Sequence, residues 1–263
     1  MKKNVLLEGL NINEELNALS WVDIENNNLF FRDLVTGHES MHSISTKPSN
    51  VFYFDLKEAL ILDDLGISHF DRDTGCLKTI ICMKDLLRNR YMRGNDGVKL
   101  GPEKYLLGSM SIEDPAKKIG AVWLVEKNKI IQVSENHIPN LFLVLKNKVL
   151  VTDSMRKVIY SHSVSSGEVE GVWSDLSHFD GEPDGGCLSE EGFIYIALWG
   201  EGAILKLDQE GQVLATKAVP FKQPSNCKAK GNKLFITSAT VGLSNEDISD
   251  YPRSGSLYSM DLF

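Results

Sequence analysis

Long apolar runs are missing from this 263-residue chain. The longest, residues 140–151 (NLFLVLKNKVLV), is interrupted by lysines and is shorter than the roughly 20 apolar residues that cross a bilayer. The first 15 residues hold only a brief apolar stretch before Glu8, too short for the core of a secretory signal. We therefore expect no membrane partner and no export.

Cysteine is also scarce, and the 28 basic residues are outnumbered by 36 acidic ones. Cys76, Cys82, Cys187 and Cys227 form no C-x-x-C pair, a pattern typical of reduced thiols in a cytosolic protein, so we expect a cytoplasmic location. The formal net charge is -8 and the sequence pI is about 5.3. A chain without a basic surplus has little attraction for a phosphate backbone, which argues against nucleic acid as a partner.

Linkers and serine-hydrolase motifs are absent from the sequence as well. No stretch rich in Pro, Ser, Gly or charge of one sign divides the chain, which predicts a single domain over residues 1–263. No serine stands in a G-x-S-x-G context and the six histidines follow no motif. A Ser-His-Asp triad is therefore not expected.

Short strand patterns fill the chain instead. Residues 19–24 (LSWVDI), 193–199 (FIYIALW) and 233–239 (KLFITSA) are typical: rich in β-branched and aromatic residues and separated by turn residues. A convincing amphipathic helix is hard to find. The sequence predicts an all-β protein.

The turns between these strands recur at a regular spacing. Four similar turns end at Gly37, Gly75, Gly167 and Gly211, which are 38, 92 and 44 residues apart. The interval of 92 is about twice 46, and residues 122–129 (VWLVEKNK) look like the missing hairpin. The chain therefore repeats a unit of roughly 40 residues.

A second marker keeps the same phase. Pro48, Pro139, Pro183 and Pro224 each precede a strand pair, 91, 44 and 41 residues apart. Counting central strands gives six units, and an all-β repeat of this length predicts a six-bladed β-propeller, with a β-sandwich as the rival. The last unit lacks its outermost strand, and we expect residues 3–7 to supply it and close the ring.

Polar residues occupy one phase of this repeat, just after the marker positions. In a propeller, residues at equal phase converge on the central channel. The set holds two carboxylates, two carboxamides and two hydroxyls: Glu8, Asp184, Asn95, Asn140, Ser49 and Ser225. All-oxygen ligands with two negative charges suit a hard divalent cation such as calcium or magnesium. The alternative is that each is a turn residue that bonds its own backbone.

Four motifs carry a family resemblance along nearly the whole chain. They are LLEG (6–9), RGNDG (93–97), IPN (138–140) and EPDGGCLSEEG (182–192). In this order and spacing they resemble the senescence marker protein/gluconolactonase (regucalcin-like) family, whose members are six-bladed propellers that bind one divalent metal. The resemblance implies calcium as the first candidate, with zinc, manganese or magnesium as alternatives.

The resemblance also implies roles for particular residues. Glu8, Asn140 and Asp184 match the metal ligands, and Arg93, Asn95 and Glu113 match the residues that contact substrate. Family members typically hydrolyse lactones of sugar acids. We therefore expect a metal-dependent lactonase acting on a small-molecule lactone, with Asp184 also serving as the general base.

Departures from the family pattern fall beside the proposed ligands. Leu10 and Ile12 replace a proline and a tryptophan, and residues 140–142 read NLF in place of NGL. Two alternatives therefore stay open: a propeller that binds a metal or ligand without turnover, and an esterase or phosphotriesterase-like hydrolase on the same metal. We also expect Gly185 and Gly186 to allow unusual φ angles and to leave room for metal and substrate.

Overall fold

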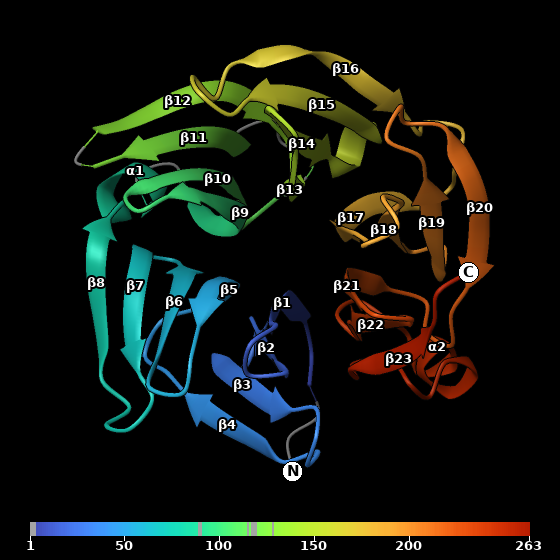
Figure 1. Ribbon diagram of the computed structural model, residues 1–263, viewed down its shortest axis with the longest axis horizontal. Coiled ribbons are helices and arrows are strands. Elements are labelled where there is room, and N and C mark those ends of the chain that lie inside the picture. Colours follow the sequence, from blue (N-terminus) through green and yellow to red (C-terminus); the bar gives the residue numbers. More distant parts are fainter. Residues whose placement is uncertain (1–3, 89–90, 115, 117–119, 128) are drawn as a thin grey trace. The chain divides into compact units, whose positions relative to one another are not determined.

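Six sheets make up the protein, one for each repeat (Figure 1). The computed structural model describes residues 4–88, 91–114, 116, 120–127 and 129–263. Within them five sheets have four strands and one has three, and consecutive strands of a sheet are neighbours. We call the sheets blades 1 to 6 in chain order.

The strands of blades 1 to 3 are β1 (Leu7–Asn13), β2 (Ala18–Asp23), β3 (Asn28–Asp33), β4 (Glu39–Ser43), β5 (Pro48–Phe54), β6 (Glu58–Asp63), β7 (Gly66–Asp71), β8 (Leu77–Cys82), β9 (Met92–Gly101), β10 (Lys104–Ser111), β11 (Gly120–Glu126) and β12 (Lys129–Asn136). A short helix, α1 (Lys84–Arg88), joins blades 2 and 3.

The strands of blades 4 to 6 are β13 (Pro139–Leu145), β14 (Lys148–Asp153), β15 (Val158–Ser163), β16 (Val169–Asp175), β17 (Glu182–Leu188), β18 (Ile194–Trp199), β19 (Ala203–Leu207), β20 (Val213–Ala218), β21 (Pro224–Lys230), β22 (Lys233–Ser238) and β23 (Tyr258–Asp261). A 3₁₀ turn, η1 (Ser154–Arg156), follows β14, and α2 (Asn245–Asp250) lies between β22 and β23.

The repeat predicted from the sequence is confirmed strand by strand. The six central strands expected from the spacing are the second strands of the six blades: β2, β6, β10, β14, β18 and β22. The four turns ending in glycine, and the hairpin expected at residues 122–129, all join the third strand of a blade to the fourth. The four marker prolines all lie at the first or second position of a blade's first strand.

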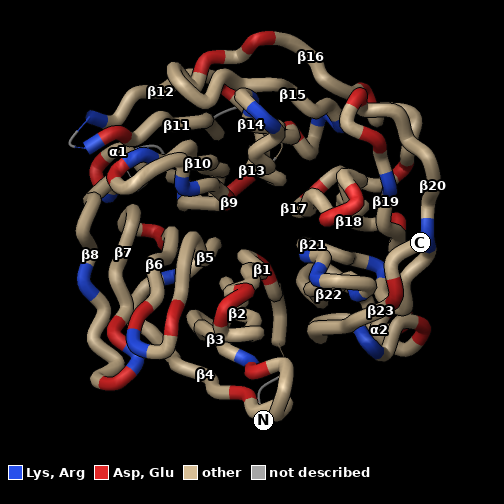
Figure 2. The backbone as a smooth tube through the Cα atoms, in the orientation of Figure 1, with Lys and Arg blue, Asp and Glu red and all other residues tan. Residues whose placement is uncertain are grey.

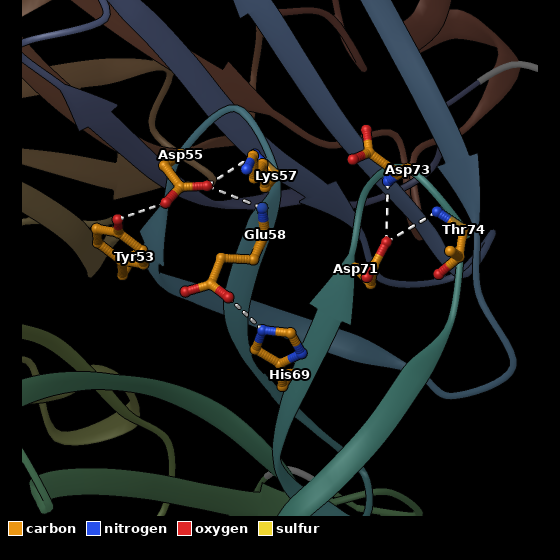
Figure 3. Close-up of polar contacts among 8 residues, drawn as sticks. All are labelled: Tyr53, Asp55, Lys57, Glu58, His69, Asp71, Asp73 and Thr74. Carbon is orange, nitrogen blue, oxygen red and sulfur yellow. Dashed lines mark hydrogen bonds and ion pairs between the residues drawn. The ribbon is translucent and has the colours of Figure 1, made fainter.

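Side-chain hydrogen bonds explain why the glycine turns recur. In blade 2 the Asp71 carboxylate accepts from the backbone N–H of Asp73 and of Thr74, at 3.0 and 2.8 Å, and Gly75 follows with φ +72° (Figure 3). Asp33 makes the corresponding contacts in blade 1. A short acceptor side chain and a left-handed glycine together build a tight turn from local residues alone.

The contacts divide the chain into two compact units, which are described separately. The blade 1–3 unit comprises residues 8–139, and the blade 4–6 unit comprises residues 140–263 with the N-terminal residues up to Leu7. The single domain over residues 1–263 stays a prediction.

Apolar clusters lie between neighbouring blades within each unit. Leu60 and Leu62 of β6 pack with Tyr105 and Leu107 of β10. In the other unit, Leu145 of blade 4 belongs to one cluster with residues of β18 and β19, and a further cluster joins β18 to β21 and β22. Each fully buried aliphatic or aromatic side chain contributes about 1.5–3 kcal/mol, so packing of blade against blade stabilises each unit.

The N-terminal segment contacts blade 6 but does not extend it as an outer strand. Leu6 forms an isolated bridge with Ala239, directly after β22, and the Thr240 N–H donates to Val5 O at 2.8 Å. The expectation of a fourth strand beside β23 from residues 3–7 is therefore wrong for the described residues. The segment pairs beyond the end of β22, where the backbone leaves the sheet; residue 3 lies outside the described residues.

Charges of both signs occur in every blade (Figure 2). Across the described part of the chain, neither helix has the length or apolar character that crossing a membrane requires.

Protonation of His162 opposes folding. Its Nδ1 lies 2.7 Å from Gly167 O, which can only accept, so Nδ1 carries a proton. Nε2 is buried and has no hydrogen-bond partner among the described residues, and burial lowers the pKa of His162 below its ordinary value of 6.5. The folded state disfavours the charged ring. The contribution of His162 to the free energy of unfolding is therefore complete above pH 6.5 and decreases as the pH falls below that value.

We therefore expect the free energy of unfolding, measured by urea denaturation, to fall between pH 7 and pH 5. The His162→Gln variant, which keeps a donor but does not titrate, should show a shallower dependence. The remaining slope includes His42, whose pKa is also lowered, by burial and by Arg72. Equal slopes in the two proteins would contradict the assignment to His162.

Candidate active site

Four of the six polar residues of the shared repeat phase lie where the first strand of their blade departs from its register. In blade 5 the pairing of β17 with β18 shifts between Pro183 and Gly186, which places Asp184 in a β-bulge. Shifts at the same place in blades 2, 3 and 6 include Ser49, Asn95 and Ser225. A bulge turns a side chain out of the regular alternation, and bulges are frequent beside active sites.

Asp184 is buried, with 7% of its surface exposed, between a proline and two glycines. A Cβ atom on Gly185 would lie 2.4 Å from Cγ of Asn226, and one on Gly186 would lie 2.3 Å from Tyr195 O. Neither glycine has a positive φ. The expectation of unusual φ angles and room for a ligand is therefore wrong: these glycines let β17 pack closely against β21 and β18.

Asn226 lies beside the predicted site residue Asp184 and was not among the residues predicted from the sequence. Its side chain is 4% exposed and packs against Gly185, next to Asp184. Its Oδ1 is buried and accepts no hydrogen bond within the described part of the chain. A buried acceptor without a donor costs about 1–3 kcal/mol, which marks this position as unusual.

Asn140 is tied to the strand that carries Asp184 through one serine. Asn140 Nδ2 donates to Ser154 Oγ at 3.0 Å, and Ser154 Oγ donates to Pro183 O at 2.7 Å. Asn140, Ser154 and Asp184 are all buried and belong to the blade 4–6 unit. The structure therefore links the predicted ligand Asn140, through Ser154, to the residue that precedes the predicted ligand Asp184.

Strained backbone follows Asn140. Leu141 and Phe142 have φ values of +76° and +41°, although neither is glycine. Such conformations cost about 1–3 kcal/mol each, and here both side chains are buried in compensation. The departure from the family's NGL pattern thus falls on a backbone conformation for which glycine is better suited.

Arg93 and Asn95 lie together in β9 of the blade 1–3 unit. Arg93 Nη1 donates to Asn95 Oδ1 at 2.8 Å and to Gly94 O at 2.9 Å, and Asn95 Nδ2 donates to Pro139 O at 3.1 Å. Both side chains are buried. The two predicted substrate-binding residues therefore orient each other.

Glu8 is partly buried in β1, and its carboxylate accepts from the Gly9 N–H at 3.2 Å. Gly9 has φ +58°, and a Cβ there would lie 2.7 Å from Asn50 Cα. This close approach fixes the backbone beside Glu8 against the first strand of blade 2.

Glu113 is exposed in the connection after β10. The register pairs Met110 with Arg93, and the Ile112 N–H donates to Tyr91 O at 2.9 Å, so the segment follows the start of β9. The described structure gives no hydrogen bond between Glu113 and Arg93 or Asn95.

Burial at the start of β17 favours the neutral form of Glu182. Burial raises the pKa of Glu182, two residues before Asp184, and the charge of Lys157 only partly opposes this. Burial likewise disfavours charge on a carboxylate unless a cation or hydrogen bonds compensate.

The donor set fits a hard cation. Carboxylate and carboxamide oxygens are what calcium and magnesium bind, and Asn140 and Asp184 supply one of each in buried positions. Within the described chain no three His, Cys, Asp or Glu side chains gather where they could hold a metal, so a site built only from these residue types has no support.

A separate pocket of about 420 Å³ lies in the blade 4–6 unit. Its lining includes Trp173, Asp175, His178 and Gln212, and it contains none of the sequence-predicted site residues.

Comparison with known proteins decides the family. A family model described as the SMP-30/Gluconolactonase/LRE-like region matches residues 6–240. The chain belongs to this family. L-arabinolactonase of Azospirillum brasilense is 27% identical to it over 271 residues, which cover 97% of this chain and 88% of that protein.

Two solved structures confirm the fold. The calcium-binding protein regucalcin of Agrobacterium tumefaciens has a TM-score of 0.88 at 24% identity, covering 98% of this chain and 90% of that one. A gluconolactonase of Xanthomonas campestris has a TM-score of 0.71 at 17% identity, covering 90% and 84%. The prediction of an all-β, six-bladed β-propeller is therefore confirmed.

Ser154 and Asn226 were both missed from the sequence. Each lies one residue after a position that the repeat identified. Ser154 follows the last residue of the central strand β14, and Asn226 follows the predicted phase position Ser225. The hydroxyl of Ser225, which was in the predicted ring, instead contacts Leu7 O and Thr237 Oγ1. A search one residue to either side of the shared phase would have found Asn226.

The close approach of Asn226 to Gly185 gives a test of the packing beside Asp184. We expect Gly185→Ala to lower the free energy of unfolding by about 1–3 kcal/mol, because the new methyl group overlaps the Asn226 side chain. Asn226→Ser in the same chain should restore part of the loss, and urea unfolding of the four proteins of the cycle measures the coupling.

Gly101→Ala is the matched control, since a Cβ there meets only Lys104 Cβ, at 3.7 Å. Additive effects of the Gly185 and Asn226 substitutions would show that the two residues do not compete for space.

Proposed function

We propose that this protein hydrolyses lactones of sugar acids and uses a divalent cation held by Glu8, Asn140 and Asp184. The observation that carries the proposal is that buried Asn140 is linked through Ser154 to Pro183, next to buried Asp184, in a chain whose family includes lactonases. Glu8 enters as the third ligand on the strength of its repeat phase and the family pattern. The oxygen ligands suit calcium or magnesium, and the family resemblance makes calcium the first candidate, with zinc or manganese as further alternatives.

Asp184 is the proposed general base. A water molecule attacks the carbonyl carbon of the lactone, and Asp184 takes the proton that this water loses. The ring C–O bond then breaks, and the proton passes from Asp184 to the departing ring oxygen, which becomes the hydroxyl group of the open hydroxy acid. A bound divalent cation supplies charge stabilisation for the carbonyl oxygen during the attack.

Arg93 and Asn95 are proposed to bind the hydroxyl groups of the sugar acid. Their mutual hydrogen bond holds the guanidinium in one orientation before substrate arrives. Preorganisation of this kind lowers the entropy lost on binding. Glu113 is proposed to accept a hydrogen bond from a substrate hydroxyl, on the family pattern alone.

The strained Leu141 and Phe142 favour a second candidate. Beside Asn140 these two residues replace the Gly and Leu of the family pattern, so the pocket is expected to differ in shape from that of other family members. A differently shaped pocket favours an ester or another lactone as the substrate, with the same cation. The L-arabinolactonase relative supports the sugar-acid lactone as the first class to test.

Removal of the cation and of Asp184 tests the proposal. We expect chelator-stripped protein to hydrolyse no aldonolactone, and added calcium, magnesium, manganese or zinc to restore turnover. Asp184→Asn should lower kcat by about 100-fold or more, because the variant cannot accept the proton. Asp180→Asn, an exposed carboxylate in the preceding segment, is the control.

Simple esters and phosphotriesters in the same panel separate the alternatives. Turnover of esters alone would replace the lactonase assignment with an esterase. Turnover that survives the chelator would contradict the cation, and no turnover with any cation or substrate would favour a propeller that only binds.

A separate prediction concerns Arg93. We expect Arg93→Lys to raise KM for the lactone by about 10-fold with a smaller change in kcat, because lysine keeps the charge but not the planar fork that contacts Asn95 and Gly94. Steady-state kinetics measure both constants. The control is Arg32→Lys, since Arg32 forms a surface ion pair with Glu39, and this variant should leave KM unchanged. An equal change of KM in the two variants would contradict the proposal that Arg93 binds substrate.

A further inference from the structure

One hydroxyl group contacts the segments that carry both Asn140 and Asp184. Ser154 is the first residue of η1 and is 2% exposed. Its Oγ lies 3.0 Å from Asn140 Nδ2 and 2.7 Å from the carbonyl oxygen of Pro183, which belongs to the peptide group preceding Asp184. All of these residues belong to the blade 4–6 unit.

The count of protons at Ser154 fixes the orientation of the Asn140 amide. A serine hydroxyl has one hydrogen to donate, and a carbonyl oxygen can only accept. Ser154 therefore donates to Pro183 O and accepts from Asn140, which has to turn its NH₂ group toward the serine. The amide is planar, so Asn140 Oδ1 lies on the arm directed away from Ser154.

This orientation is the one that a cation requires. A divalent cation binds the carboxamide oxygen and not the NH₂ group. If the amide turned over, its NH₂ would replace the oxygen. The same hydroxyl also holds the backbone next to Asp184, so one side chain governs both positions.

We propose that Ser154 is a positioning residue that selects the cation-binding orientation of Asn140 and holds Asp184 beside it. The inference rests on the proposed function, because the cation is the one assigned to lactone hydrolysis. Ser154 itself needs no contact with the cation or the substrate.

The repeat supports a role specific to blade 4. The residue that directly follows the second strand differs from blade to blade, and of the six only Ser154 carries a hydroxyl. The six are Ile24, Asp64, Ile112, Ser154, Gly200 and Ala239. The fold at this corner therefore does not require a hydroxyl, and the one that is present lies in the blade that carries Asn140.

Calorimetric titration of chelator-stripped protein with calcium chloride, and with manganese chloride as a second probe, tests the inference without any measurement of turnover. We expect Ser154→Ala to weaken cation affinity by about 10- to 100-fold, the range found when groups that orient metal ligands are removed. Ser154→Cys is close to serine in size but makes weak hydrogen bonds, and should also weaken affinity.

Ser174→Ala is the matched control. Ser174 is a buried serine of the same unit whose Oγ donates to Gly211 O at 2.8 Å. It should keep wild-type affinity, and melting temperatures in chelator should fall by similar amounts in Ser154→Ala and Ser174→Ala.

Wild-type affinity in Ser154→Ala would overturn the inference, and if that variant does not fold, Ser154→Cys decides in the same way. A wild-type protein that binds neither cation overturns the inference and the metal-dependent function together. A protein that binds the cation, loses affinity in the Ser154 variants and hydrolyses no lactone supports the role of Ser154 and refutes the proposed function alone.

Discussion

In blades 2, 3, 5 and 6 the register between the first two strands shifts beside the polar residue of the shared repeat phase, and the candidate site depends on these shifts. Marker prolines stand there in blades 2, 5 and 6, and proline has no N–H to donate to a strand ladder. The register shift after Pro183 leaves Asp184 in a bulge, and similar shifts follow Pro48 and Pro224. The same local constraint, repeated from blade to blade, therefore takes polar side chains out of the regular alternation of the sheet.

Close packing beside the bulges limits which residues can stand there. Gly9 and Gly185 both lie where a Cβ would overlap a neighbouring blade, with Asn50 Cα at 2.7 Å and Asn226 Cγ at 2.4 Å. Leu141 shows the opposite case, a large side chain on a left-handed backbone, held by burial among apolar neighbours. Strained backbone therefore follows Asn140, and tight contact follows Asp184, as is common where structure serves chemistry.

Hydrogen bonds set the direction of the buried carboxamide groups at the shared repeat phase. Asn95 is held between Arg93 and Pro139, and Asn140 is held by Ser154. An amide has a donor arm and an acceptor arm, so a partner on one arm decides what the other arm offers to a ligand. The chemistry proposed for this chain depends on these orientations as much as on residue identity.

The sequence by itself determined the repeat, the six blades and the phase of Asn140 and Asp184, because the signals are local: a side-chain acceptor such as Asp71 and a left-handed glycine such as Gly75 build each turn from adjacent residues. Family motifs added the roles expected of Glu8, Arg93, Asn95 and Glu113. Only the tertiary structure placed Ser154 between Asn140 and Pro183, packed Asn226 against Gly185 and joined Leu6 to Ala239. These contacts join residues between 14 and 233 positions apart, and no local pattern specifies which distant group will meet a given side chain.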